Sequence, residues 1–468
     1  MTTIDTPADT PADTPADTPA EHLRGLCGGA VHLPGDEAYD VLRTPWNLAA
    51  DLRPAAVAVP RSAADVADVM HAALDAGLRV APISTGHAAA LLTLGSLDDV
   101  VVVRMSALTG VTVDPEARIA RVEGGTLWQD VVEAAAEHGL AALHGSSPDV
   151  AVAGYCLGGG IGWYARKHGF AANSVAAVEL VTPNGELLRV DADHHADLFW
   201  ALRGGGGNFG VVTALEISLL PHADAYAGML LWDREAAPEV LRAWAAWTQD
   251  APEEVTTSFR VLSFPPLPEL PPFLSGRQLV VIDGAVLADD RTAEELLAPL
   301  RALAPEMDTF ARVPATAVTR IHMDPEGGAP SGADHTLLAD LPEEAVQAFL
   351  TEVGPGTTTT LLAAELRQLG GALARRTESG GAVGAVDARF AAFFVGIAPT
   401  PEAYAAVRAD AARVVAALEP WSAQRELPTF AEHADSARRC YDEADWARLR
   451  ALRAQVDPGG RMRAGHVI

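Results

Sequence analysis

A strand-like run ends in a loop whose side chains could bind a phosphate and react. The run LRVAPIS leads through Ser84, Thr85 and Gly86 to His87 and Ala88. Backbone N–H groups in a loop of small residues can form a concave anion site, and the two hydroxyls add donors. The loop therefore predicts a pyrophosphate site with an imidazole beside it. An ordinary turn with an exposed histidine is the alternative.

Two further segments are dense in glycine. They are HGSSPDVAVAGYCLGGGIGWYARKHG at residues 144–169 and DLFWALRGGGGNFGVVTALEISLLP at residues 197–221. Glycine permits close backbone approach, which a bulky planar ligand requires. The first of these segments is also compatible with a packed turn between a strand and a helix.

The second glycine segment contains a formal G-x-G-x-x-G at Gly205, Gly207 and Gly210. A dinucleotide fingerprint of this kind follows a strand and opens a helix. Here the helical run DLFWALR precedes the glycines, and the strand-like run VVTALEISLL follows them. The context does not indicate a Rossmann fold, so we expect these glycines to let a strand pass close to a cofactor.

Alternating helices and strands must position these segments. Ser62 is expected to cap a helix before the LRVAPIS strand, and a hairpin is expected to turn at Asn184-Gly185. From about Tyr226 the strand candidates become longer, which predicts a sheet-based second unit and an α+β fold class. The longer strand candidates are 227–232, 255–264, 278–288, 357–369 and 388–398, and the helical runs are 292–304, 401–419 and 443–456.

Length and composition exclude several classes of protein. A chain of 468 residues favours two domains. Its formal net charge of −28 would repel a nucleic-acid backbone. Three scattered cysteines indicate neither a disulfide framework nor a metal site, and we expect a cytoplasmic location. No apolar run approaches the roughly 18 residues of a membrane helix, so no membrane partner is expected.

The N-terminus repeats Thr-Pro-Ala-Asp over residues 6–20. Such a polar, proline-punctuated tract cannot bury enough apolar surface to offset the entropy of ordering it. We therefore expect a disordered tail over residues 1–23. A docking arm is the functional alternative.

The three segments, in this order and spacing, resemble the FAD-binding domain of berberine-bridge-type oxidases, in the PCMH-type (vanillyl-alcohol oxidase) superfamily. LGGGIGW, RKHG and DLFWALRGGGGNFGVVT carry the resemblance, which covers about residues 40–220 and the C-terminal end. It implies a two-part FAD-binding domain at 24–222 that the chain rejoins at 425–468. Between them, residues 223–424 would form a substrate-binding domain with a multi-stranded antiparallel sheet covered by helices.

The resemblance also implies FAD, bonded covalently through His87, which matches the family's flavin-linked histidine. Many members add a second bond through a cysteine before a proline, but this chain has Ser147 before Pro148, so we expect one link. The residues implied to contact FAD are Ser84, Thr85, Gly86 and Ala88 at the pyrophosphate, Gly145, Ser146, Ser147, Asp149, Ala151, Gly154, Tyr155, Gly159 and Gly160 at the isoalloxazine and ribityl chain, and Gly210 and Val212 near adenine.

The reaction implied is oxidation of a small organic substrate by hydride transfer to flavin N5, with oxygen reoxidising the flavin to give hydrogen peroxide. The family's Tyr-x-Asn-Tyr-like motif is missing, and His433 stands in its place. An imidazole can accept a proton near neutral pH, so we expect His433 to be the catalytic base, with a surface histidine as the alternative. Tyr155, which could donate to the flavin C2 carbonyl or merely pack in the core, and Tyr164 are the next catalytic candidates.

Two other functions stay open. The missing tyrosine motif is compatible with a non-redox cyclase or isomerase that keeps FAD as a structural group. A metabolite-binding resistance protein is the third hypothesis, for which saturable binding without turnover would be the sign. The identity of the substrate and the oligomeric state are not determined by the sequence.

Overall fold

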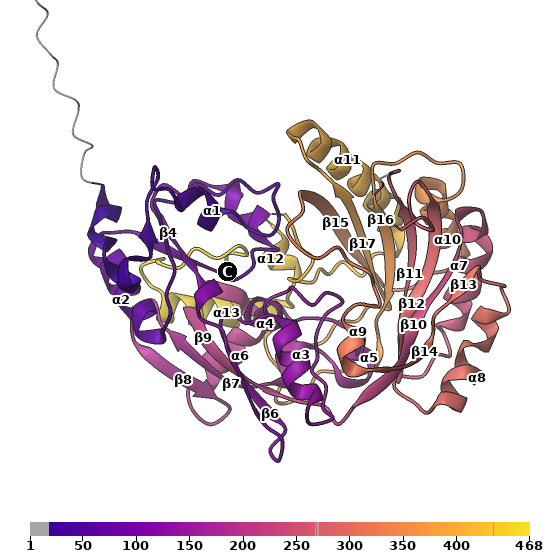
Figure 1. The fold of residues 1–468 in the computed structure, drawn as a ribbon, viewed down its shortest axis with the longest axis horizontal. Coiled ribbons are helices and arrows are strands. Elements are labelled where there is room, and N and C mark those ends of the chain that lie inside the picture. The colour runs from indigo at the N-terminus through magenta and orange to yellow at the C-terminus, as the bar shows by residue number, and fades with distance from the viewer. Residues whose placement is uncertain (1–17, 267, 269–270, 434) are drawn as a thin grey trace, which may run out of the picture.

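The computed structural model describes residues 18–266, 268, 271–433 and 435–468. Within these residues the strands form three sheets, two in the N-terminal half and one in the C-terminal half (Figure 1). The first sheet has the order β1-β2-β4-β3, in which β2 and β3 both lie parallel to β4. Its strands are β1 (Val31–His32), β2 (Ala56–Ala58), β3 (Arg79–Ile83) and β4 (Val100–Arg104).

A helix links β2 to β3, at the place where the sequence predicts a helix capped by Ser62 before the LRVAPIS strand. It is α2 (Ala63–Asp75), and the Ser62 side chain caps its start by accepting from Asp65 N at 3.0 Å. A shorter helix, α1 (Tyr39–Arg43), precedes β2. This part of the chain matters for function because the loop after β3 carries His87.

The second sheet is antiparallel throughout, with the order β5-β6-β9-β7-β8. Its strands are β5 (Val111–Asp114), β6 (Ile119–Glu123), β7 (Val175–Val181), β8 (Leu187–Asp191) and β9 (Val211–Ser218). The predicted hairpin at Asn184-Gly185 joins β7 to β8, and Gly185 adopts a φ of +84° there. The helices of this part are α3 (Trp128–Ala136), α4 (Val152–Leu157), α5 (Ala165–His168) and α6 (Ala196–Gly205).

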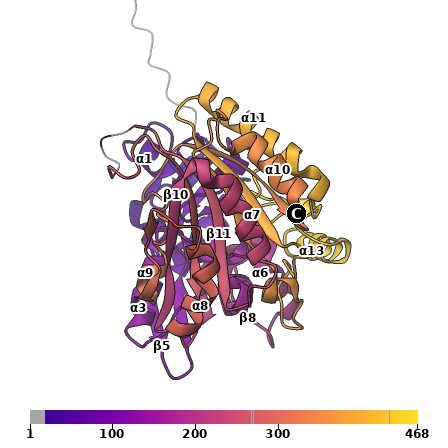
Figure 2. The ribbon, with the colours of Figure 1, turned by 90° about the vertical axis from the view of Figure 1, so that its right-hand side faces the viewer.

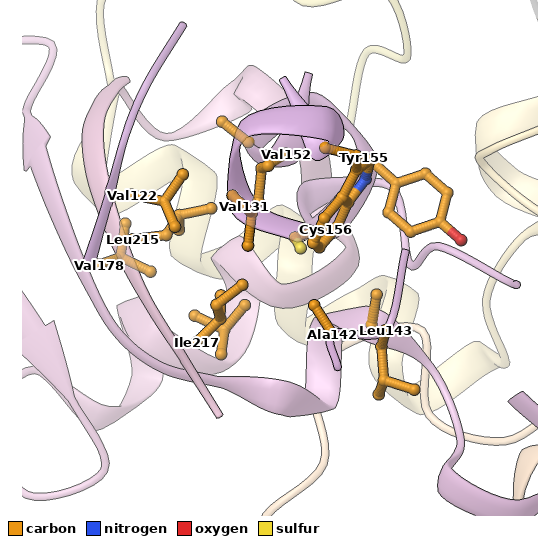
Figure 3. Packing of buried hydrophobic residues seen from close by; sticks show 14 of the residues in the cluster. Val122, Val131, Ala142, Leu143, Val152, Tyr155, Cys156, Val178, Leu215 and Ile217 are labelled. Carbon is orange, nitrogen blue, oxygen red and sulfur yellow. The ribbon is translucent and has the colours of Figure 1, made fainter. Parts of the chain in front are cut away.

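Apolar side chains of α3 and α4 pack on this sheet (Figure 3). Val152 and Cys156 of α4 are at most 1% exposed. They lie in one cluster with Val178 and Leu215 of the sheet. This packing fixes the short helix α4, which carries Tyr155 at the edge of the cluster.

The third sheet is also antiparallel, with the order β13-β10-β12-β11-β16-β17-β15 and β14 beside β10. Its strands are β10 (Asp224–Asp233), β11 (Val255–Ser263), β12 (Gln278–Val286), β13 (Met307–Asp308), β14 (Ala311–Pro314), β15 (Ser331–Leu338), β16 (Ala363–Gln368) and β17 (Phe390–Ile397). Helices α7 (Ala237–Trp247), α8 (Asp290–Arg301), α10 (Glu343–Val353) and α11 (Pro401–Leu418) cover one face, as Figure 2 shows. A four-residue helix, α9 (Ala315–Val318), follows β14.

Side chains of the third sheet alternate between its two faces. On β11, Val255, Phe259 and Val261 pack in the core under the helices. Ser258 and Arg260 therefore point to the opposite face, which is turned toward the first two sheets in Figure 1. This face is polar and forms part of the candidate site.

The chain finally returns to the first sheet. Helices α12 (Ser436–Arg439) and α13 (Glu443–Val456) lead to a terminal segment beside β3. There Val80 N donates to Arg461 O and Arg463 N donates to Val80 O, both at 2.8 Å. The described part of the chain contains no helix long and apolar enough to cross a bilayer.

Three local expectations need correction. Most of the predicted tail, residues 1–17, lies outside the described residues, but Pro19–Leu23 forms a 3-10 helix because Ala20 and Leu23 pack in the core beside α2. No strand was expected at 331–338, where β15 pairs with β17. The strand expected at 357–369 starts only at Ala363, since Asp410 Oδ2 accepts from Thr360 N at 2.7 Å and holds the threonine run outside the sheet.

Candidate active site

A cavity of ≈ 270 Å³ lies where the three predicted segments meet. Its walls come from residues 82–89 after β3, 150–158 around α4, and 204–212 between α6 and β9, together with 428–429 and 464–466. Ten of the residues predicted to bind cofactor line it, namely Ser84, Thr85, Gly86, His87, Ala88, Ala151, Gly154, Tyr155, Gly210 and Val212. Segments far apart in the sequence thus share one cavity.

His87 is held in a defined orientation at this cavity. Its ring stacks on Trp46, with centroids 4.2 Å apart and planes 18° from parallel. Its Nδ1 lies 2.8 Å from Thr85 Oγ1. Gly86 has a φ of +85°, and an added Cβ would come within 2.6 Å of Pro45, so the loop requires glycine there. Burial lowers the pKa of His87 to about 4, which leaves the imidazole neutral at pH 7.

The hydroxyls expected at the phosphate have protein partners instead. Ser84 Oγ donates to Gly124 O at 2.9 Å, and Thr85 Oγ1 contacts His87. The predicted anion site therefore depends on backbone N–H groups, since these two side chains are already engaged.

Asp149 and Ser147 support Trp46 rather than line the cavity. Trp46 Nε1 and Ser147 Oγ each donate to the Asp149 carboxylate at 2.7 Å. Gly327 N, from the second half of the chain, donates to the same carboxylate at 3.0 Å. Burial alone would raise the pKa of Asp149, but these hydrogen bonds outweigh it and hold the pKa below its usual value.

Tyr155 belongs both to the core and to the cavity wall. Its ring lies between two glycines, because a Cβ at Gly145 or Gly160 would come within 2.9 or 2.4 Å of it. Its hydroxyl is buried and has no hydrogen-bond partner among the described residues, and burial raises its pKa. Figure 3 shows the hydroxyl pointing away from the apolar cluster. Gly145, Ser146, Ser147, Asp149, Gly159 and Gly160 do not line the cavity themselves.

The other two catalytic candidates lie outside the cavity lining. The Tyr164 ring packs 5.4 Å from that of His144 in the core. His433 Nε2 contacts Asp334 Oδ1 at 3.0 Å, and the Arg408 guanidinium lies 3.0 to 3.2 Å from both ring nitrogens. The hydrogen bond with Asp334 raises the pKa of His433.

The cavity fits a large, planar ligand such as a flavin. A Cβ added at Gly154 would meet nothing within 4 Å, so this glycine leaves open space beside α4. A Cβ at Gly206 would likewise meet nothing nearer than 3.9 Å. The buried Tyr155 hydroxyl offers a polar group that the surrounding protein leaves unpaired. Together these features provide both the room and a buried donor for a polar heterocycle.

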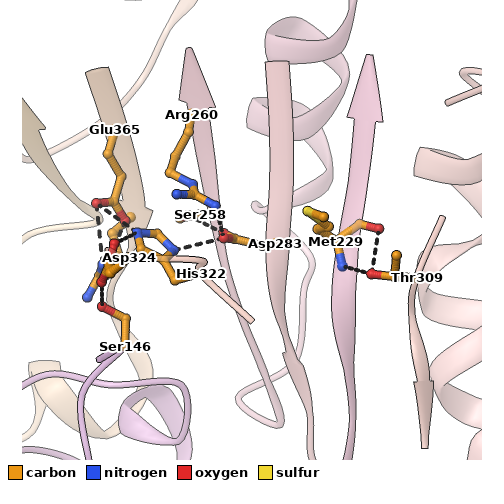
Figure 4. Close-up of polar contacts among 10 residues, drawn as sticks. Ser146, Met229, Ser258, Arg260, Asp283, Thr309, His322, Asp324 and Glu365 are labelled. Carbon is orange, nitrogen blue, oxygen red and sulfur yellow. Dashed lines mark hydrogen bonds and ion pairs between the residues drawn. The ribbon is translucent and has the colours of Figure 1, made fainter. Parts of the chain in front are cut away.

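A charged cluster lies on the polar face of the third sheet, and Ser146, from the segment before α4, donates to its member Asp324 at 2.9 Å (Figure 4). Asp283 of β12 is fully buried and accepts from Ser258 Oγ at 2.5 Å and from Arg260, both on β11. His322 Nδ1 lies 2.8 Å from the same carboxylate. On β16, Arg367 Nε donates to Glu365 Oε1 at 2.7 Å. We call Arg260, Asp283, His322, Asp324, Glu365 and Arg367 the charged cluster.

The charges of this cluster depend on one another. Burial and Arg260 would each lower the pKa of His322, but Asp283, Asp324 and Glu365 outweigh them and raise it to about 9. Burial would raise the pKa of Glu365, but Arg367 and His322 hold it low. His322 is therefore a cation at neutral pH, between carboxylates.

Sequence reasoning missed the charged cluster. Its members come from β11, β12, β16 and the loop after α9, so they are spread between residues 260 and 367 of the chain. A signal was available, because Arg260, Asp283, Glu365 and Arg367 are the charged residues of three otherwise uncharged strands. Charged residues are rarely buried without partners, so such residues indicate a polar site or a charge network.

Comparisons with known proteins agree with this geometry. Residues 54–191 match the family model described as an FAD binding domain. (R)-6-Hydroxynicotine oxidase of Paenarthrobacter nicotinovorans is 35% identical over 206 residues, 44% of this chain and 44% of that protein. Glucooligosaccharide oxidase of Sarocladium strictum is 31% identical over 235 residues, 49% of this chain and 47% of that protein. The chain thus matches about half the length of these relatives.

Solved structures resemble the chain over most of its length. The 6-hydroxy-D-nicotine oxidase of Arthrobacter nicotinovorans superposes with a TM-score of 0.80 at 24% identity, over 92% of this chain and 96% of that one. The BBE-like 1 protein of Physcomitrella patens gives a TM-score of 0.82 at 19% identity, over 96% and 98%. The chain is therefore a homologue of FAD-linked oxidases, with an FAD-binding domain at residues 54–191 and the fold of the berberine-bridge-like, PCMH-type proteins.

Proposed function

We propose that the protein is an FAD-dependent oxidase of a small organic substrate, with molecular oxygen as the final acceptor and a role in secondary metabolism. One observation carries the proposal. A glycine-lined cavity holds a neutral histidine, and Asp324 of the charged cluster lies close enough for its charge to act on that histidine. Bound FAD would supply the two-electron acceptor, and the charged face would bind the substrate.

We assign FAD to this cavity. Backbone groups of residues 84–88 would bind the pyrophosphate, and residues 151–155 would lie along the flavin ring. Gly210 and Val212 would contact adenine. We keep FAD-binding parts at 24–222 and 425–468 and a substrate-binding domain at 223–424 as the proposed division. A cytoplasmic location is proposed as well, supported by three buried cysteines that form no disulfide.

We further propose that His87 is the covalent flavin ligand. Its Nδ1 is engaged by Thr85, so Nε2 is the nitrogen left for the bond, and the low pKa keeps the imidazole nucleophilic at pH 7. Flavin should therefore stay with the polypeptide after acid precipitation, and peptide mass spectrometry should find it on the peptide containing His87.

Two variants separate this linkage from binding in general. His87→Ala should bind FAD non-covalently, because the cavity is built largely from backbone and glycine, and should release it on precipitation. Ser147→Ala should keep the covalent flavin, since Ser147 Oγ donates to Asp149 instead. Flavin mass on a peptide spanning Ser147, or complete release from the wild-type chain, would contradict the single link.

The oxidase activity itself is tested by stopped-flow spectroscopy without oxygen, followed by readmission of air. A substrate should bleach the bound flavin, and air should restore its colour with formation of hydrogen peroxide. Product formation without bleaching would instead support a cyclase or isomerase, and tight binding without any product would support a metabolite-binding protein.

A further inference from the structure

The loop between α9 and β15 joins the charged cluster to the flavin-binding segments. Ser146 Oγ donates to Asp324 Oδ2 at 2.9 Å. Three residues later, Gly327 N donates to Asp149. Asp324 is also one of the two carboxylates whose charge acts on the His87 imidazole. Its side chain is 36% exposed, unlike the other carboxylates of the cluster, so a small molecule can reach it.

His322 points one ring nitrogen at this carboxylate. Its Nδ1 lies 2.8 Å from Asp283, which orients the ring. Its Nε2 then lies 3.9 Å from Asp324 Oδ1 and 3.7 Å from Glu365 Oε2. Both distances exceed those of an N–H···O hydrogen bond, roughly 2.7–3.2 Å. Figure 4 shows this ring between the carboxylates. The buried N–H thus has acceptors nearby but none at bonding distance.

His322 Nε2 and Asp324 Oδ1 could be bridged by a single oxygen atom that lies about 2.8 Å from both of them. That atom must accept from an N–H and donate to a carboxylate. A hydroxyl does both, whereas an ammonium group has no lone pair with which to accept. The arrangement therefore discriminates between alcohols and protonated amines.

We propose that the substrate is an alcohol, that Asp324 accepts its hydroxyl proton, and that His322 is the positioning residue for the hydroxyl oxygen. The inference rests on the proposed oxidase function and names its substrate class. Glu365 and Asp283 act through their charges, since Arg367 and Arg260 pair with them.

The step balances in atoms and electrons. The O–H proton moves to Asp324 Oδ1 and converts the carboxylate to a carboxylic acid. The C–H bond of the same carbon breaks, and bound FAD would supply the two-electron acceptor for its hydrogen and electron pair. The alcohol carbon becomes a carbonyl, and His322 donates to its oxygen throughout.

The experiment measures flavin reduction without oxygen in the holoenzyme, using a panel of secondary alcohols, hemiacetal sugars and the matched primary amines. Wild-type flavin should be reduced by at least one alcohol or hemiacetal and by none of the matched amines. For that alcohol, Asp324→Asn should slow reduction about 10²- to 10⁴-fold with FAD content and thermal midpoint unchanged. Asp324→Glu should recover part of the rate.

Three further variants complete the set. Glu326→Gln is the matched control from the same loop, where Glu326 pairs with Arg320 on the surface, and it should reduce at the wild-type rate. His322→Gln should weaken the alcohol's Kd, measured from the change in flavin absorbance on binding, more than it slows reduction at saturation. His433→Ala tests the other candidate base, and a loss of roughly 10²-fold there would make His433 the acceptor and overturn the inference.

The outcomes separate the inference from the function on which it rests. Reduction by an amine but by no alcohol, or full reduction by Asp324→Asn, would overturn the inference and leave the oxidase proposal standing. A wild-type flavin that no compound of the panel reduces would count against both. The expected result is that Asp324→Asn slows flavin reduction by the alcohol while the FAD content stays unchanged.

Discussion

At the scale of single residues, the charge balance of the charged cluster depends on the protonated His322. Without its proton, Asp283, Asp324 and Glu365 would be balanced only by Arg260 and Arg367. Because its pKa of about 9 in the fold exceeds the reference value near 6.5, the folded protein binds this proton more tightly than the unfolded chain does. The resulting stabilisation is fully present below about pH 6.5 and is lost as the pH rises through about 9.

His322→Gln removes this titration while keeping a hydrogen-bonding side chain. We expect wild type to exceed the variant in free energy of unfolding by roughly 3 kcal/mol near pH 6, with the difference shrinking between pH 7 and pH 9. Urea unfolding of both proteins at pH 6, 8 and 10 measures it. A difference that is constant over this range would contradict the assigned charge.

Ten residues that the sequence singled out line one cavity, whereas it singled out no residue of the charged cluster. His87 and its neighbours lie in one short loop after a strand, so the sequence alone shows that these residues are close together. Asp283 and His322 meet only because the third sheet folds with a particular strand order. That order depends on tertiary packing, which spacing along the chain does not encode.

At the scale of elements, α4 and the glycines around it form the best-defined part of the cavity. Gly160 has a φ of +73°, and a Cβ there would come within 2.4 Å of the Tyr155 ring. Gly154 is different, because a Cβ there points into open space at the cavity. Gly160 therefore allows close packing against Tyr155, and Gly154 leaves space for a ligand.

Substitutions should separate these two roles. Gly160→Ala should destabilise the flavin-free protein by roughly 1–3 kcal/mol, from left-handed strain and overpacking. Gly154→Val should change the stability of that protein by less than about 1 kcal/mol but lower the FAD bound per chain. Denaturant unfolding and flavin absorbance measure the two effects. The assignment of the cavity fails if Gly154→Val binds FAD normally.

The ends of two helices with a strong helical period in the sequence were predicted to within one residue. Helix α13 spans Glu443–Val456, as the sequence indicates, and α11 differs by one residue. Strand β15 was missed, although its residues from Ser331 to Leu338 pair with β17. Pairing with a distant strand decided the conformation there, and local composition did not.

At the scale of the whole molecule, Arg166 joins the two halves. It lies on α5, is 7% exposed, and donates to four backbone carbonyls of the second half. The acceptors are Leu369 O at 2.9 Å, Pro252 O at 2.9 Å, Val255 O at 2.5 Å and Ala251 O at 3.1 Å. Burial lowers the pKa of Arg166 to about 10, yet the guanidinium stays charged at neutral pH.

Removing this side chain should weaken the whole fold. Arg166→Met leaves buried carbonyls without donors and should cost roughly 3–5 kcal/mol of unfolding free energy, measured by denaturant titration. Arg291→Met is the matched control, since Arg291 is 87% exposed and pairs with Glu295 on the surface, and should change stability by less than about 0.5 kcal/mol. Equal effects of the two variants would remove Arg166 from this role.

The return of the chain to β3 also sets the order in which a newly made molecule can become complete. Residues 464–466 form part of the cavity wall, and Arg461 and Arg463 add their backbone to β3. A ribosome that has not yet translated these codons carries a chain in which the proposed flavin cavity lacks one side. Loading with FAD is therefore expected to follow synthesis of this segment, however early the N-terminal sheets fold.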